Sequence, residues 1–378
     1  MAPQDPGDQE WDDEDDESPG RSFLFKEFVV SGFHSDDGMM NVPIGNMDLD
    51  HADLSPRPPG SYLGLDYVHT FADSSWINKN VLGDWLPLDA VGLHPRFLYD
   101  PMESRHDPDI VKFAPQDFWV RFQPGNVDRL TLRVGQFVIP YGVNPVLAPR
   151  QRFILPLEAT DLGLKWDWGV DVKGPIGEYD WEVATTIGSG EALHSPHFLE
   201  GSERSSYLVT GRVGTPTYWD LQYGLSFLYG DLPVLRAATL LSPVSISRRR
   251  LSLDLFYKHG TYLMLGGQVT YGQDGFRSDA RFVKVGGKPL GKTADVLGTR
   301  LYLDWVVPDY EDWRLACQYE SVVRDTATTE SDDTAVIVEI TYSLTTATSV
   351  VLDYRHELNN SMGRETDALF LMFVYYGK

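Results

Sequence analysis

Residues 129–142 read RLTLRVGQFVIPYG, and the order of residue types in this stretch is the strongest indication of the fold. Alternate positions carry the apolar side chains Leu130, Leu132, Val134 and Val138. Arg133 and Gly135 lie between them, and the run stops at Pro140. A period of two predicts a strand with one apolar and one polar face. In a soluble protein such a strand turns its apolar face to the hydrophobic core. In an outer-membrane barrel it turns this face to lipid and its polar face to water.

The same alternation recurs along the chain. Residues 160–173, TDLGLKWDWGVDVK, place Leu, Trp and Val on one face and Asp, Gly and Lys on the other. Residues 218–229, 296–305 and 313–323 repeat the pattern, with aromatic residues such as Trp219 and Tyr229 near the ends of the runs. Soluble strands have about five or six residues, whereas a tilted strand needs about 9–11 to cross a bilayer. The length and the aromatic ends favour a transmembrane barrel with a wet lumen.

Sixteen strands can be placed in this way. They are expected at 23–33, 61–71, 85–98, 113–123, 129–139, 160–173, 178–187, 205–214, 217–229, 244–258, 261–272, 295–306, 312–323, 334–343, 348–357 and 366–376. Short and long connections alternate between them, and both ends of the chain fall on the short-turn side. Outer-membrane barrels combine an even strand number with short periplasmic turns and longer external loops. The sequence therefore predicts an all-β, 16-stranded antiparallel transmembrane β-barrel.

Composition divides the chain into two parts. Residues 1–20 carry nine acidic residues and no Lys or Arg, which predicts a disordered acidic N-terminal tail before a barrel over 21–378. The formal net charge of −23 argues against a nucleic-acid partner. Cys317 is the single cysteine, which excludes a disulfide framework and a CxxCH haem attachment. The opening MAPQDPGDQEW does not predict a signal peptide, so a cytoplasmic protein and a mature form with a new initiator Met both stay open.

Two motifs invite other functions. Residues 286–293, GGKPLGKT, match the phosphate-loop pattern, but an alternating strand is expected after them where the motif needs a helix. His194 and His197 could bind a metal, but Pro196 separates them and no third ligand is near in the sequence, which favours a surface loop. No HExxH or GxSxG motif occurs, and no carboxylate pair stands out as an acid/base dyad. The sequence predicts no enzyme, no cofactor and no metal.

The opening stretch resembles the phosphate-selective porin O/P superfamily. Members carry a strand ending in G-Q-F-x-x-P-[FY]-G, followed by an Asp-x-Gly strand and a short Gly-containing turn. The matching residues are Gly135, Gln136, Phe137, Pro140, Tyr141 and Gly142, then Asp161, Gly163 and Gly174. The specific resemblance covers about residues 113–190. It implies an outer membrane of a Gram-negative bacterium, a homotrimeric channel, and a third external loop that folds inward to narrow the pore.

Strand counting and the resemblance both place the third external loop at 140–159, with Pro140 ending strand pairing at the external rim. If the loop folds inward, it and the nearby lumen wall supply the candidates for the pore constriction. These are Arg150, Arg152, Glu158, Asp161, Arg121, Arg133, Lys165 and Asp167. Phosphate-selective members line the pore with basic residues, but here the lumen faces mix both signs, so phosphate selectivity is not expected. The chain departs from the family in a second way, because its last strand ends in Gly377-Lys378 and not in an aromatic residue.

Three functions remain open at this level. The leading one is a porin-like channel for passive diffusion of small hydrophilic solutes or ions, surrounded by outer-membrane lipid. The alternative is a structural barrel that sheathes a multihaem cytochrome, periplasmic or in the outer membrane, in a porin–cytochrome electron-transfer conduit. Because the chain has no haem motif, this partner would bring all the redox chemistry. A soluble β-rich binding protein, the third reading, should be purifiable without detergent.

Overall fold

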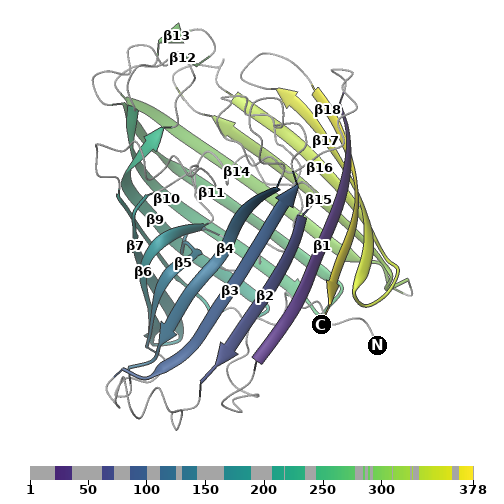
Figure 1. Ribbon diagram of the computed structural model, residues 1–378. Helices are drawn as coiled ribbons and strands as arrows, with labels where there is room; N and C mark the ends of the chain where they lie inside the picture. Colours follow the sequence, from purple (N-terminus) through teal and green to yellow (C-terminus); the bar gives the residue numbers. More distant parts are fainter. Residues whose placement is uncertain are drawn as a thin grey trace.

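A single closed antiparallel sheet forms the body of the protein (Figure 1). The computed structural model describes residues 22–35, 62–71, 86–99, 111–124, 130–142, 166–188, 207–216, 218–234, 244–276, 284–285, 288–289, 293–308, 310–323, 326, 332–359 and 366–377. Each strand of the barrel wall pairs with the next wall strand along the chain. β1 (Ser22–Ser35) pairs with both β2 (Tyr62–Thr70) and β18 (Thr366–Gly377), which closes the barrel. Closure leaves the wall without an unpaired strand edge.

Sixteen strands build the barrel wall within these residues. They are β1 (Ser22–Ser35), β2 (Tyr62–Thr70), β3 (Leu88–Tyr99), β4 (Val111–Phe122), β5 (Thr131–Val138), β6 (Trp166–Ile176), β7 (Tyr179–Thr186), β8 (Tyr207–Gly214), β9 (Leu221–Val234), β10 (Val244–His259), β11 (Leu263–Phe276), β14 (Thr293–Val306), β15 (Trp313–Val323), β16 (Asp332–Ser343), β17 (Thr348–Asn359) and β18 (Thr366–Gly377). Every predicted strand corresponds to one of them, so the predicted fold class is confirmed.

The differences from the prediction are local. A two-stranded sheet of β12 (Lys284–Val285) and β13 (Lys288–Pro289) lies between β11 and β14, in a segment expected to be an external loop. β14 begins at Thr293, so the phosphate-loop-like run is followed by a strand and not by a helix. The predicted acidic tail, residues 1–20, and the start of the predicted strand 160–173 lie outside the described residues.

The alternation in the sequence becomes an outer and an inner face. Along β9 the exposed side chains are those of Leu221, Tyr223, Leu225, Phe227 and Tyr229, and the positions between them are buried. On β10, Leu253 is 63% exposed, and its neighbours across the sheet, Leu225 and Val269, are also exposed. An apolar surface of this extent is not stable in water, whereas a lipid bilayer solvates it. The outer face therefore fits a membrane.

Aromatic rings gather toward both ends of the strands. Ring pairs are formed by Trp313 and Tyr342, by Tyr179 and Tyr223, and by Tyr207 and Tyr229. The first two pairs lie near short turns and the third lies nearer the long connections. Tyr and Trp favour the two membrane–water interfaces because each joins an apolar ring to a polar group. No helix of the described residues is long and apolar enough to cross a membrane.

Short turns join strands at one end of the barrel. β6 and β7 are connected by Gly177 and Glu178, and β10 and β11 by residues 260–262. Gly177 has a φ of 66° and Gly260 a φ of 56°, a left-handed conformation that glycine adopts without steric cost. The start of β1 and the end of β18 lie at this same end, since Lys26 pairs with Gly377. The predicted position of both chain ends on the short-turn side agrees with this register.

Candidate functional site

The inward faces of the strands form a lumen lined by arginine–carboxylate ion pairs. The pairs are Arg121–Asp89, Arg133–Asp171, Arg133–Glu182, Arg212–Asp254, Arg248–Asp274, Arg250–Asp274, Arg314–Asp304 and Arg355–Glu357. They come from strands all around the barrel. Most of the pairs join adjacent strands, whereas Arg212–Asp254 and Arg133–Glu182 each reach across an intervening strand. The inner face of the wall therefore presents fixed charges of both signs.

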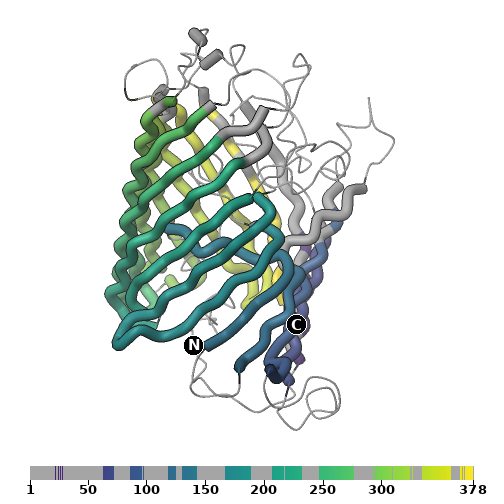
Figure 2. The backbone as a smooth tube through the Cα atoms, turned by 90° about the vertical axis from the view of Figure 1, so that its left-hand side faces the viewer, coloured from purple at the N-terminus to yellow at the C-terminus, as the bar shows by residue number. Residues whose placement is uncertain are grey.

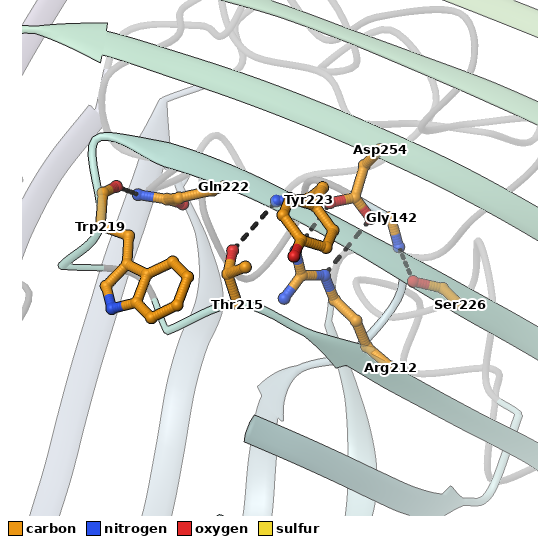
Figure 3. A network of polar contacts seen from close by, with 8 residues as sticks. All are labelled: Gly142, Arg212, Thr215, Trp219, Gln222, Tyr223, Ser226 and Asp254. Carbon is orange, nitrogen blue, oxygen red and sulfur yellow. Dashed lines mark hydrogen bonds and ion pairs between the residues drawn. The ribbon is translucent and has the colours of Figure 1, made fainter. Parts of the chain in front are cut away.

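Arg212 shows how the wall accommodates such pairs (Figure 3). Its side chain reaches from β8 across β9 to Asp254 on β10, with 2.7 Å between Nη2 and Oδ2. Gly224 of β9 lies between them, paired with Gly214 on one side and Asp254 on the other. A Cβ atom on Gly224 would lie 2.5 Å from Arg212 Nη2. Because Gly224 has no side chain, the Arg212 guanidinium can cross β9 and reach Asp254.

Arg133, a predicted constriction residue, lies on the inner face of β5. Its Nε donates to Asp171 Oδ2 at 2.9 Å, and its Nη2 donates to Glu182 Oε1 at 3.0 Å. The guanidinium carbon is also 4.6 Å from the centre of the Phe137 ring. Arg133 thus faces the lumen, with two carboxylates beside it.

The segment Ile139–Gly142 leaves β5 and turns into the lumen. Ile139 and Tyr141 are fully or almost fully buried and pack against Leu208 of β8 and Leu228 of β9. Gly142 N–H donates to Ser226 Oγ at 3.0 Å (Figure 3). The blue trace in Figure 2 crosses the barrel interior toward the opposite strands. The start of the third external loop therefore lies inside the barrel.

A second contact carries the segment further across. Tyr141 O–H donates to Thr270 Oγ1 of β11 at 3.4 Å, and Thr270 in turn donates to Ser252 of β10. These strands are separated from β5 by several others around the wall. Polar bonds to β9 and β11, together with apolar packing on β8 and β9, fix this end of the loop to the inner wall.

These contacts correct the predicted role of Pro140. It was expected to end strand pairing at the external rim, and β5 does end at Val138. Pro140 itself is buried, because the chain turns inward directly after this short strand.

A glycine with a positive φ lies on each side of this inward turn. Gly135 has a φ of 136° and a Cβ on it would overlap the carbonyl of Phe118; Gly142 has a φ of 58° and a Cβ on it would overlap the side chain of Gln268.

The other predicted constriction residues differ in outcome. Arg150, Arg152, Glu158, Asp161 and Lys165 lie outside the described residues. Arg121 on β4 pairs with Asp89 on β3.

Asp167 is fully buried, and its carboxylate accepts backbone N–H groups of Trp168 and Gly188, both at 2.8 Å. Its position on β6 and these two bonds make it a local brace where β6 begins and the chain leaves β7. These are structural contacts, and the predicted place of Asp167 at the pore constriction stays a prediction.

Several residues of the lumen were not singled out by the sequence analysis. Arg212, Arg248 and Arg250 are the clearest examples, and Arg250 Nη2 lies 2.6 Å from Asp274 Oδ1. Alternation places each of them on an inner face, but the pairing partner depends on strand register, which a single sequence does not give. The described residues hold no group of three or more His, Cys, Asp or Glu side chains suited to a metal ion.

Comparison with known proteins finds similarity at the level of the fold. No protein-family model matches this chain, and no curated protein matches it. Among solved structures, OmpT of Vibrio cholerae in its trimer form matches with a TM-score of 0.58 and 12% identity, over 95% of this chain and 99% of that one.

An anion-selective porin from Comamonas acidovorans matches with a TM-score of 0.59 and 11% identity, over 94% of this chain and 99% of that one. Salmonella typhi OmpF, in complex with daunomycin, matches with a TM-score of 0.60 and 11% identity, over 95% and 98% of the two chains. These alignments include nearly the whole of every chain. The protein therefore has the fold of a porin-like outer-membrane barrel.

Proposed function

We propose that the protein is a channel in the outer membrane of a Gram-negative bacterium, through which small hydrophilic solutes or ions diffuse passively. The observation that carries this proposal is the division of the wall, with an apolar outer face and an inner face lined by ion pairs. Lipid solvates the outer face, and charged side chains keep the lumen hydrated. The similarity of fold to porins supports the same function.

The charges of the lumen favour a channel of broad selectivity over one for phosphate. A phosphate site needs arginines that can turn their N–H groups to the solute. Here Arg133, Arg212 and Arg314 each bond to carboxylates of the wall. The resemblance of Gly135–Gly142 to the phosphate-selective porin O/P superfamily supports a shared loop architecture and does not extend to the selectivity.

The inward segment favours an open channel over a sheath for a cytochrome. A sheath needs a lumen wide enough for a folded partner, whereas Ile139–Gly142 occupies part of the cross-section and is bonded to the far wall. The same segment narrows the path of a solute, which is the role of a constriction loop. The charges further along the loop, at Arg150, Arg152, Glu158 and Asp161, are proposed to act at this narrow section.

A homotrimer is the proposed assembly. The support is the trimer form of OmpT, which has a similar fold. The molecular mass of the detergent-solubilised protein, measured by sedimentation with the detergent contribution subtracted, should be about three times the 42.6 kDa of the chain. A mass of one chain would leave the channel proposal in place and remove the trimer.

The channel itself is tested by reconstitution. Purified protein refolded into planar lipid bilayers should give stepwise increases in current as single channels insert. Liposomes that contain it should swell when small sugars are added outside, because the solute enters with water. Folded barrels that insert and give neither current nor swelling would contradict the proposal. They would favour the alternative function, a structural barrel around a cytochrome.

A further inference from the structure

Trp119 is a tryptophan on the inner face of the barrel wall. On β4 it is two residues from Arg121, and Arg121 is directly opposite Arg133, whose bonds to Asp171 and Glu182 place it on the inner face. Side chains two residues apart on a strand point to the same side, so Trp119 also faces the lumen. It is half-buried. The membrane interface does not explain a tryptophan at this position.

Glycines lie opposite Trp119 on both neighbouring strands. They are Gly92 of β3 and Gly135 of β5. A Cβ atom on Gly92 would lie 2.3 Å from Trp119 Cε2 and 2.4 Å from Cζ2, so the indole lies against β3 in the space that a side chain there would occupy. The backbone of β3 supports one side of the indole, while Trp119 stays partly exposed.

This position is next to the narrow section of the lumen. Gly135 comes four residues before Ile139, where the chain turns inward and packs on Leu208 and Leu228. Four strand residues span about 13 Å. A solute that passes the inward segment therefore meets Trp119 within a short distance.

An ion pair borders the indole on the same two strands. Arg121 Nε bonds to Asp89 of β3, and the two side chains are 26% and 23% exposed. Arg121 is two residues, or about 7 Å, from Trp119 along β4, and Asp89 is three residues from Gly92 along β3. An aromatic ring, a guanidinium and a carboxylate therefore lie together on the wall, and a solute in the lumen can reach all three.

The described charges on this part of the wall balance one another. Arg212 of β8, which lies opposite Glu182, is itself bonded to Asp254. The charged side chains nearer to Trp119, taken in chain order, are Asp89, Arg121, Arg133, Asp171, Lys173 and Glu182. Three of these are positive and three are negative. The wall beside the indole therefore offers donors and acceptors without a net attraction for one sign of charge.

We propose that Trp119 and the Arg121–Asp89 pair form a subsite for neutral ring sugars. The inference rests on the proposed channel function and specifies a solute class for it. A pyranose has a face of C–H groups, whose partial positive charge suits the negative face of an aromatic ring. Its hydroxyl groups lie around the edge of the sugar ring, where they can donate to the Asp89 carboxylate and accept from N–H groups of Arg121. Binding sites for small molecules commonly combine an aromatic surface with a few placed polar groups.

Other solutes meet only part of this arrangement. A small ion is attracted by one member of the Arg121–Asp89 pair and repelled by the other. An apolar solute could stack on Trp119 but would remove water from both charged side chains without replacing the lost hydrogen bonds. A linear polyol supplies hydroxyl groups but has no fixed C–H face, so ordering it on the indole costs conformational entropy.

Liposome swelling compares a ring sugar with a linear polyol that has the same number of carbon atoms. The probes are D-glucose and D-sorbitol, each added to vesicles that contain the full-length protein. We expect glucose to enter several-fold faster than sorbitol in the wild type. The glucose rate should level off as the concentration rises, because a site fills, whereas the sorbitol rate should rise in proportion to the concentration.

Two substitutions separate the aromatic face from simple filling of the space over Gly92. Trp119→Phe keeps an aromatic ring and should retain most of the preference for glucose. Trp119→Leu occupies much of the same space without a ring and should bring the glucose-to-sorbitol ratio close to one. A preference that survives in Trp119→Leu, or that is lost equally in both variants, would overturn the subsite.

Trp168→Leu is the matched control, because Trp168 is 40% exposed on the outer face of β6, two strands from Trp119. It should leave the glucose-to-sorbitol ratio unchanged. A loss equal to that of Trp119→Leu would overturn the subsite in favour of a general effect on the barrel.

The wild type separates this inference from the proposed function. If glucose and sorbitol enter at equal rates, the channel stands and the subsite falls. If neither solute enters through a folded, inserted barrel, the channel proposal fails and the subsite fails with it.

Discussion

At the scale of single residues, the glycines of the wall differ in what lies where their side chain would be. A Cβ on Gly135 would overlap the backbone of Phe118 on the adjacent strand, and Gly135 also has a positive φ. A Cβ on Gly177, in the β6–β7 turn, would meet nothing within 4 Å, although its φ is also positive. Both positions require a positive φ, but only Gly135 lacks room for a Cβ atom.

This difference predicts unequal effects of the same substitution. Gly177→Ala should cost about 1–2 kcal/mol of unfolding free energy, the usual strain of a left-handed alanine. Gly135→Ala should cost clearly more, because the strand pairing of β4 and β5 must also give way. Chemical denaturation of the barrel in lipid vesicles measures both values. Equal values for the two variants would mean that β4 and β5 are not as close at this point as the structure has them.

At the scale of the strand, the division into outer and inner faces can be tested with one charge. Leu253 is near the middle of β10 and faces outward. Leu253→Arg should lower stability by about 2–4 kcal/mol, the cost of a charge facing lipid near the bilayer midplane. Leu253→Phe keeps the position apolar and should change stability much less.

A second control places the charge on the other face. Thr341 lies on the inner side of β16, where its hydroxyl donates to Glu339. Thr341→Arg should cost much less than Leu253→Arg, because the new charge points to a hydrated wall. There it meets Glu339 on its own strand as well as Arg314 directly across on β15. Folding titrations in vesicles compare the variants. Equal losses for Leu253→Arg and Thr341→Arg would refute the assignment of the two faces.

The strands could be predicted from the sequence because alternation is a local property. Leu221, Tyr223 and Leu225 reveal an outward face without knowledge of any other strand. The partner of Arg212 could not be found in the same way, since Asp254 lies two strands away and 42 residues further along the chain. The inward turn at Pro140 was also out of reach, because its direction depends on Leu208 and Leu228, which are distant in sequence.

At the scale of the whole molecule, the inward segment joins the fold to the proposed function. Tyr141 packs on Leu208 and Leu228 and bonds to Thr270 on the far side of the lumen. Tyr141→Ala should loosen this anchor and raise the single-channel conductance, because the segment would obstruct less of the cross-section. Tyr271→Ala is the control, since Tyr271 is 52% exposed on the outer face of the same strand as Thr270. A conductance that is the same in all three proteins would show that the segment does not limit the current.

The charges beyond this anchor set the expected ion preference of the channel. Arg150 and Arg152 follow Gly142 by eight and ten positions, in the part of the loop outside the described residues. Because the chain is already inside the barrel at Gly142, we expect both arginines to act on ions in the narrow section, where low-dielectric walls strengthen their field. Replacing both with Ala should raise the preference for cations and increase the conductance, since two positive charges and their bulk are removed.

Reversal potentials in a salt gradient across a planar bilayer measure this preference. Arg249→Ala is the matched control, because Arg249 is exposed on the outer face of β10, where its guanidinium carbon lies 5.6 Å from the centre of the Tyr229 ring. Its removal should leave the reversal potential unchanged. If the double Arg150→Ala, Arg152→Ala variant also leaves it unchanged, these two arginines lie away from the ion path. The selectivity would then be set by the paired charges of the wall, with Arg133, Asp171 and Glu182 as the next residues to replace.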